Sequence, residues 1–324
     1  MKKVLITGGA GYIGSFLANK LIKNNYKVSI IDNLSTGRKN LVNKKSIFYK
    51  LDLQNKNKVT KIFNKNKFDT VFHLAASLNI QESDNDKKKY FANNVKVTSF
   101  MIDLCKKYNI KNFIFASSCS VFGNYNRPVS EEDLKKPISY YAETKLISEN
   151  EIKKKLIKTK YALLRYFNVV GADKKNKIGE INNHDHLFKN YSRECLKKKP
   201  IFKIYGSNYD THDGSCIRDY IHINDLIDIH IKTLKYLDQK RKNLELNCGY
   251  GKGYSVLEIC KKFKKKTKNS QILINERRVG DPRIAICDNK KMKKILNFRP
   301  KFNKIELMVN QSIEWENFLK IYKL

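Results

Sequence analysis

A tyrosine and a lysine four residues apart open one helix-like segment of this chain. Tyr141 and Lys145 stand in the run Ser139-Tyr-Tyr-Ala-Glu-Thr-Lys-Leu, which begins a predicted helix that ends near residue 157. Residues four apart share a helix face, and an ammonium group near a phenol favours the phenolate, which can act as a general base. The spacing alone is weak evidence in so lysine-rich a chain, because Tyr236 and Lys240 repeat it and are interpreted as surface residues.

A serine cluster upstream distinguishes Tyr141 from that second pair. The strand-like run 112–116 ends in Ser117-Ser118-Cys119-Ser120. In parallel α/β sheets, ligands bind outside the carboxyl ends of the strands, which is where this cluster falls. We therefore predict a proton-transfer site that contains Ser118, Tyr141 and Lys145, in preference to a plain amphipathic helix.

The start of the chain carries the signature of an anion site. An apolar run leads into the segment Thr7–Gly14 and then into a helix-like stretch. The glycines have two registers, with Gly11 and Gly14 preceded by either Gly8 or Gly9. Either register allows a tight turn, close approach of a pyrophosphate and exposure of free N–H groups at the helix start.

An acid follows at the distance typical of a ribose ligand. Asp32 ends the second apolar run, about 20 residues beyond the glycine turn. A carboxylate there accepts hydrogen bonds from both ribose hydroxyls and repels a 2′-phosphate, so the pattern favours NAD over NADP. Gly37-Arg38 is the one nearby feature that could meet a phosphate instead. The cation of a bound nicotinamide and the lysine together would supply the roughly 4 kcal/mol needed to lower a tyrosine pKa from about 10 towards 7.

The intervening segments predict the fold that positions these groups. Strand-like runs at 46–51, 70–74, 112–116 and 161–167 alternate with helix-like runs at 55–66 and 90–108. This alternation predicts an α/β fold, a Rossmann-like doubly wound parallel sheet. Beyond Gly171 the pattern loosens, so we predict an NAD-binding domain at 1–168 and a smaller C-terminal α/β substrate domain at 169–324. Segments such as 216–237 are expected to pack back on the first domain.

Composition excludes several classes of function. The net charge of +35 comes from lysines spread along all 324 residues, together with many Asn, Ile, Phe and Tyr residues that share A/T-rich codons. No nucleic-acid-binding motif accompanies the charge, so we predict no nucleic-acid partner and only a modest attraction for anionic substrates. No apolar run approaches the ~20 residues of a membrane span, and the N-terminus enters a strand without a signal peptide. We therefore predict no membrane association.

The remaining cysteines and histidines suggest no metal site. The seven cysteines form no C-x-x-C pair, which fits a reducing cytoplasm. His184-Asp-His186 lacks an evident third ligand, so we interpret it as a polar loop. His73 and His222 stand in apolar strands and are predicted to be packed core residues.

Taken together, the motifs resemble those of the extended short-chain dehydrogenases/reductases. They are Thr7–Gly14, Asp32-Asn-Leu34, His73-Leu-Ala-Ala76, Ser117-Ser118, Tyr141-x-x-x-Lys145, Arg165-Tyr-Phe-Asn168, Arg218–His222 and Arg278-x-x-Asp281. Their order most resembles that of the UDP-glucose 4-epimerases, and the likeness runs from Val4 to about Trp315.

The resemblance implies a cofactor site and a substrate site. Tyr141 would be the base, Ser118 would hydrogen-bond the sugar O4, and Lys145 would complete the catalytic group. The implied NAD contacts are Gly8, Gly11, Tyr12, Ile13, Gly14, Asp32, Asn33, Asp52, Leu53, Leu74, Ala75, Ala76, Asn94, Ser117 and Lys145. The implied UDP-sugar contacts are Ser118, Tyr141, Asn168, His186, Leu187, Tyr205, Arg218, Arg278, Asp281 and Ala285.

The implied reaction is a reversible 4-epimerisation of a UDP-hexose in a homodimer. The C4 hydride would pass to NAD and return to the opposite face of a 4-keto sugar. Alternatives within the family are a 4,6-dehydratase, a decarboxylase and a UDP-uronate epimerase. A dehydratase needs an extra acid–base pair beside the serine, where this chain reads Ser118-Cys119-Ser120. An NAD-sensing or nucleic-acid-binding protein on the same fold would show a broken Ser/Tyr/Lys set, and here that set is complete.

Two segments and one single residue differ from the usual pattern of the family. Leu78-Asn79 replaces an alanine-lysine cofactor contact, and His186-Leu-Phe-Lys189 replaces a uracil-side segment that usually ends in proline. The position that lines the sugar C2 substituent falls on Ala285, where enzymes with a narrow pocket carry a tyrosine. The resemblance therefore implies that UDP-N-acetylglucosamine is accepted as well as UDP-glucose.

Overall fold

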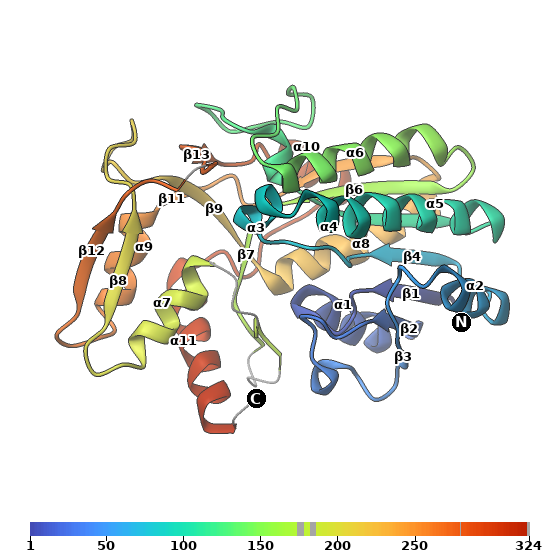
Figure 1. Cartoon of the computed structure of the whole chain (residues 1–324), viewed down its shortest axis with the longest axis horizontal. Coiled ribbons are helices and arrows are strands. Elements are labelled where there is room, and N and C mark those ends of the chain that lie inside the picture. The colour runs from blue at the N-terminus through green and yellow to red at the C-terminus, as the bar shows by residue number, and fades with distance from the viewer. Residues whose placement is uncertain (174–177, 182–185, 279, 323–324) are drawn as a thin grey trace.

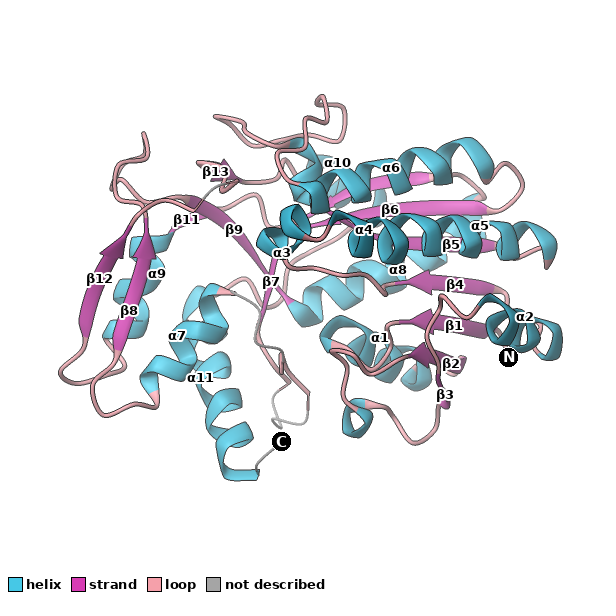
Figure 2. Ribbon diagram, viewed as in Figure 1, coloured by secondary structure: helices cyan, strands magenta, loops and turns pink. Residues whose placement is uncertain are grey.

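The computed structural model describes residues 1–173, 178–181, 186–278 and 280–322. It has two lobes: a large one built on a long sheet, and a smaller one that holds the C-terminal helix (Figure 1). The arrows of β1 and β4 point towards the side on which the smaller lobe lies (Figure 2). The carboxyl ends of the main strands therefore face the second lobe.

The main sheet has seven strands in the order β10-β6-β5-β4-β1-β2-β3, and every neighbouring pair is parallel. This is the doubly wound order of a Rossmann sheet with one strand added beyond β6, so the predicted fold class is confirmed. The strands are β1 (Lys3–Thr7), β2 (Lys27–Asp32), β3 (Ile47–Lys50), β4 (Thr70–His73), β5 (Asn112–Ser118), β6 (Lys160–Tyr166) and β10 (Leu244–Cys248).

Helices cover both faces of this sheet. The first face is covered by α1 (Tyr12–Lys23), α8 (Ile223–Lys240) and α10 (Lys290–Leu296), and the second by α2 (Lys56–Lys65), α5 (Val97–Lys107) and α6 (Tyr140–Lys155). The inner strands are largely apolar because both of their faces are buried; β1, for example, buries four of its five residues, whereas the edge strand β3 has no buried residue. Shorter helices are η1 (Lys39–Leu41), α3 (Ile80–Asn85), α4 (Lys87–Tyr90) and η3 (Cys119–Phe122).

The chain predicted as a helix at 90–108 is helical as far as Lys107, but its hydrogen-bond pattern changes along its length. It divides into the end of α4, a π-helical segment η2 (Phe91–Lys96) and α5. A π-helical turn inserts one extra residue per turn and frees main-chain carbonyls from their usual partners. Within this segment the carbonyl of Asn94 accepts from the hydroxyls of Thr98 and Ser148. The periodicity of apolar residues alone did not distinguish this π-helical segment from the α-helix around it.

The second lobe is a separate apolar cluster. Its strands are β8 (Ile201–Tyr205), which pairs with β12 (Gln271–Asn275), and β9 (Ile217–His222), which pairs with β7 (Asn168–Val170), β11 (Gly253–Ser255) and β13 (Ile284–Ala285). Three helices, α7 (Leu187–Cys195), α9 (Val256–Lys264) and α11 (Ile305–Tyr322), bury their apolar faces against β8 and β9.

The chain beyond residue 168 contributes to both lobes. Strand β10 completes the main sheet beside β6, and α8 packs on α1 in the same core cluster. The larger lobe therefore contains chain from both sides of residue 168, and no single point in the sequence separates the two lobes. The predicted domain boundary between 168 and 169 remains a prediction. Within the residues that the structure describes, no helix combines the length and apolarity that a bilayer crossing needs.

Candidate active site

The glycine turn between β1 and α1 forms a cradle that only glycine can line. Gly8 has φ +71°, and a Cβ there would lie 2.8 Å from the backbone nitrogen of Ala75. A Cβ at Gly14 would overlap the carbonyl oxygen of Gly8. No side chain caps the start of α1 at Gly11, so the helix presents its first N–H groups, Tyr12 and Ile13 among them, to this turn. Such a terminus is suited to an anion.

A buried carboxylate stands beside this cradle. Asp32, at the end of β2, accepts hydrogen bonds from the backbone N–H groups of Ala10 (2.9 Å) and Leu34 (2.8 Å). Burial raises the pKa of Asp32, and these two bonds oppose the shift. Next to it, Asn33 donates to Asp52 at 2.8 Å, and Leu53 is buried. The ends of β2 and β3 thus bring together the four residues predicted for the adenosine end of NAD.

The segment after β4 is held against the same edge. The backbone N–H of Leu74 donates to the Thr7 carbonyl at 3.1 Å, and that of Ala75 to the Thr7 hydroxyl at 3.4 Å. Ala76 follows, half-buried. His73 bonds the Thr7 and Thr98 hydroxyls, and burial lowers its pKa to about 3. Its predicted role as a packed core histidine is confirmed.

The side chain of Asn94 is engaged with its neighbours. Its oxygen accepts from the Ser77 N–H at 2.8 Å, and its nitrogen donates to the Thr144 hydroxyl at 3.1 Å. Asn94 therefore ties the segment after β4 to α6. A direct contact with nicotinamide, as the resemblance implies, remains a prediction.

The proposed catalytic group comes together where β5 and α6 meet. Ser139 caps α6 by accepting from the Ala142 N–H, and Tyr141 and Lys145 follow in its first two turns. Ser118, at the end of β5, is near enough to Tyr141 to act on its pKa, and its hydroxyl oxygen accepts from the N–H and the hydroxyl of Ser120 (3.2 and 2.9 Å). The Lys145 ammonium donates to the Ala116 carbonyl at 2.9 Å and lies 5.9 Å from the centre of the Tyr141 ring. Tyr141 and Lys145 are both buried.

Burial controls the titration of this group. It raises the pKa of Tyr141 to about 12, and the hydrogen bond from Ser118 only partly opposes the shift. It lowers the pKa of Lys145 to about 7, opposed by the charge of Glu149. We had predicted that Lys145 would help to lower the pKa of Tyr141. In the surroundings that the chain itself provides, the pKa of Tyr141 is raised, not lowered. Removal of water destabilises the phenolate more strongly than the Ser118 hydrogen bond stabilises it.

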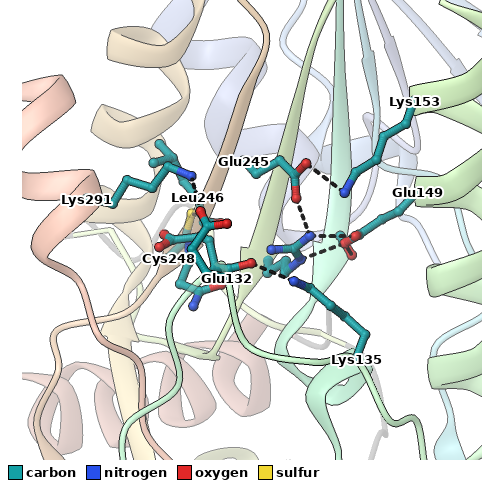
Figure 3. Close-up of polar contacts among 12 residues, drawn as sticks. Glu132, Lys135, Glu149, Lys153, Glu245, Leu246, Cys248 and Lys291 are labelled. Atoms are coloured by element: carbon teal, nitrogen blue, oxygen red, sulfur yellow. Dashed lines mark hydrogen bonds and ion pairs between the residues drawn. The ribbon is translucent and has the colours of Figure 1, made fainter.

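A buried ion pair between α6 and β6 lies next to the catalytic group. Glu149 continues the stripe of Tyr141 and Lys145 along α6, accepts from the Ser117 hydroxyl at 2.6 Å and forms a bidentate pair with Arg165 (2.8 and 2.7 Å). Arg165 also contacts Glu245, which Lys153 contacts in turn (Figure 3). We did not predict a role for Glu149; its position four residues after Lys145 is the sequence signal that could have indicated one.

The substrate-side residues of β7, β9 and β13 lie together. In the β9–β13 pairing Ala285 is opposite Arg218, whose guanidinium lies 3.5 Å from Asp281. Asn168 donates to the Asp219 carbonyl at 3.2 Å. In the main sheet Ser118 pairs with Tyr166, two residues before Asn168, and Asn168 of β7 pairs with Tyr220 of β9, two residues after Arg218. The structure thus brings these residues to the side of the catalytic group.

The other predicted substrate residues lie at the end of β8, just after β12 and at the start of α7. The Arg278 guanidinium stacks 3.8 Å from the centre of the Tyr205 ring. His186 precedes α7, where Leu187 is the first residue, and it pairs with Glu180. The neighbouring Arg277 bonds Asn208 and stacks on Tyr209.

No metal site is found where the structure describes the chain. Groups of three His, Cys, Asp or Glu side chains with the geometry of a metal site do not occur there. His184 and Asp185, which with His186 suggested a metal pair, lie outside the described residues. His222 is buried, bonds Gln311 at 2.6 Å and caps α8 through its ring nitrogen, so it is a packed histidine as predicted.

The doubly wound sheet, the glycine cradle and the Ser/Tyr/Lys group define a dinucleotide-dependent α/β enzyme. The sequence model of the NAD dependent epimerase/dehydratase family matches residues 4–249. The chain belongs to that family.

Individual relatives are similar over almost the whole chain. The UDP-glucose 4-epimerase of Lactobacillus helveticus is 36% identical, over 97% of this chain and 96% of its own length. The solved UDP-glucose-4-epimerase of Stenotrophomonas maltophila, with bound NAD and formylated UDP-arabinopyranose, superposes with a TM-score of 0.94 at 28% identity, covering 99% and 100% of the two chains. The UDP-Glc/GlcNAc 4-epimerase of Campylobacter jejuni gives 0.84 at 33% identity, covering 98% and 100%.

Proposed function

We propose that this protein is an NAD-dependent isomerase that interconverts the C4 epimers of a UDP-hexose, UDP-glucose and UDP-galactose in the first place. The observation that carries the proposal is the meeting of Tyr141, Lys145 and Ser118 at the strand ends, beside a cradle built for a dinucleotide. Relatives of the same name that match nearly end to end support the same activity.

The residues present fit NAD. The glycine cradle and the uncapped N–H groups of α1 suit the pyrophosphate, and the Asp32 carboxylate suits the ribose hydroxyls. Asn33, Asp52 and Leu53 would border the adenosine, with Ala75 and Ala76 allowing close approach from the other side. When bound, NAD supplies the hydride acceptor and a positive charge that favours a phenolate at Tyr141.

The chain's own groups would move the proton. Tyr141 accepts the proton of the sugar O4 hydroxyl, and Ser118 holds that oxygen by a hydrogen bond. The ammonium of Lys145 is held by the Ala116 carbonyl. It supplies a positive charge at pH values below its pKa of about 7. Burial of both side chains keeps water away from the reacting atoms. On the other side, Arg218, Arg278 and Asn168 would grip the diphosphate and sugar.

The dehydratase alternative lacks its extra acid–base pair. The residue after Ser118 is Cys119, and burial raises the pKa of its thiol to about 12. A thiol that stays protonated near neutral pH is a poor general base. This position therefore favours epimerisation over elimination of water.

We expect the purified protein to interconvert UDP-glucose and UDP-galactose without added cofactor. Each sugar nucleotide would be incubated separately, the products identified by NMR, and the supernatant of denatured protein assayed for NAD. Approach to one equilibrium mixture from both sides is the expected result, because hydride is removed and returned within one active site. Release of water or CO₂ from the sugar would point to the family alternatives, and a requirement for NADP would contradict the cofactor assignment.

The width of the sugar pocket is expected to depend on Ala285. This residue lies opposite Arg218 in β9–β13, and alanine lacks the bulk that a tyrosine would bring to the same position. We expect wild type to accept UDP-N-acetylglucosamine, and Ala285→Tyr to lose kcat/KM for that substrate by 10-fold or more, since a steric clash costs more than a missing contact of about 1–3 kcal/mol.

The measurement is kcat/KM for UDP-glucose and for UDP-N-acetylglucosamine in both forms of the enzyme. Activity of the tyrosine variant towards UDP-glucose serves as the internal control. A wild type that rejects the N-acetylated sugar, or a variant that discriminates no better, would show that Ala285 is not the gate.

The same proposal includes a homodimer in the cytoplasm. The resemblance supports the dimer, and the cysteines support a reducing compartment, because all seven are free. Sedimentation equilibrium and fractionation of cells are the respective measurements.

A further inference from the structure

A buried lysine occupies the position at which the resemblance leads one to expect proline. Lys189 is the third residue of α7 and only 3% exposed. Its ammonium donates to the Glu180 carbonyl at 2.7 Å and pairs with the carboxylate of Glu316 in α11. The other Glu316 oxygen accepts from Arg193 at 3.3 Å. The segment before α7, the first turn of α7 and the distant helix α11 therefore meet at one ammonium group.

An ammonium in this environment is stable only while it is paired. Burial lowers the pKa of Lys189, and the hydrogen bond with Glu316 opposes that shift. Removing one partner of a buried pair leaves the other charge without compensation, and this costs more than the pair itself contributes. The pair thus makes the position of α7 depend on α11.

The same contacts reach the end of α7 that faces the proposed substrate. Trp315, next to Glu316, donates its indole N–H to the Glu180 carbonyl at 2.7 Å. The Glu180 carboxylate pairs with His186, which immediately precedes α7. Gly179 packs on the Trp315 ring so closely that a Cβ would lie 2.5 Å from it. Glu180 therefore links α11 to both ends of the first turn of α7.

We propose that the Lys189–Glu316 pair is a latch through which the C-terminal helix holds the first turn of α7, and with it His186 and Leu187, in position for the uridine end of the substrate. Lys189 is a positioning residue, since its ammonium donates to Glu180 and Glu316. This inference rests on the proposed function, which assigns the uridine contacts to His186 and Leu187.

The test compares Lys189→Met, Glu316→Gln and the double variant. For each, the Kd for UDP is measured by calorimetry, together with KM, kcat and NAD content. We expect Lys189→Met to weaken UDP binding and to raise KM about 10-fold or more, a loss of roughly 1.4 kcal/mol, with kcat and NAD content unchanged. The double variant is expected to lose less than the sum of the two single losses, because both substitutions remove one interaction.

The matched control is Lys262→Met. It removes a different ion pair to the same helix, between Lys262 of α9 and Glu306 at the start of α11 (2.7 Å), and should leave the Kd for UDP unchanged. A folded Lys189→Met enzyme with wild-type affinity for UDP, or one that loses UDP and NAD equally, would overturn the latch. Additive losses would do so as well.

A second variant and the behaviour of the wild type cover the remaining outcomes. If Lys189→Met does not fold, Glu316→Gln decides alone, because glutamine keeps the shape of the side chain but removes the charge and replaces one of the two acceptor oxygens with an NH₂ donor: weaker UDP binding supports the latch, and unchanged binding refutes it. A wild type that binds UDP without epimerising it contradicts the proposed function and leaves the latch standing. A wild type that does not bind UDP contradicts both.

Discussion

Replacing Tyr141 with phenylalanine is expected to lower kcat by about 10³-fold. General base catalysis contributes roughly 10²–10⁴-fold, and Tyr141 is the buried phenol beside Ser118 and Lys145. The ring remains, so packing in the buried site and the glycine cradle are unaffected. Turnover would be measured with UDP-galactose, alongside the NAD content and the Kd for UDP, both of which should match wild type.

The matched control for this variant is Tyr140→Phe. Tyr140 precedes Tyr141 but faces Lys87, whose ammonium lies 5.5 Å from its ring, so the loss of its hydroxyl should leave turnover unchanged. If Tyr141→Phe retains turnover while Tyr140→Phe loses it, the base is Tyr140.

Replacing Glu149 with glutamine is expected to affect both stability and the pH profile. The carboxylate is fully buried between Arg165 and Ser117. Breaking a buried pair costs about 3–5 kcal/mol, and we expect about 3 kcal/mol here, because Glu245 still pairs with Arg165. Urea denaturation would measure the loss in the free energy of unfolding.

The pH profile follows from the effect of Glu149 on Lys145. Burial holds the pKa of Lys145 near 7, and the charge of Glu149 is the influence that raises it. Without that charge the pKa falls further, so the charged lysine is lost at a lower pH as the pH rises. The alkaline limb of kcat/KM should therefore move towards acid pH.

Glu151→Gln is the control on the same helix. Glu151 forms an i,i+4 pair with Lys155 at 3.1 Å, and both side chains are partly exposed. Such pairs contribute about 0.3–0.5 kcal/mol, so this variant should keep its stability and its pH profile. A Glu149→Gln enzyme as stable as Glu151→Gln would show that the buried pair does not hold β5, β6 and α6 together.

The sequence by itself determined the features that depend on local patterns. The alternation of apolar strands with helices predicted the parallel sheet, because the period of the apolar residues and the order of elements are short-range properties. Local patterns likewise predicted a dinucleotide site from the glycine turn and Asp32, and a proton-transfer site from Tyr141 and Lys145. Glycine spacing, distance to the acid and an i,i+4 interval are set by the local backbone geometry.

Only the tertiary structure decided the features that depend on burial and on distant partners. The shift of the Tyr141 pKa to about 12 is opposite to the one expected from its lysine neighbour, because desolvation depends on every element packed around the phenol. Arg165 and Glu149 are 16 residues apart, and Lys189 and Glu316 are 127 apart. No local pattern records such pairings, since each exists only because strands and helices bring the two charges to one buried point.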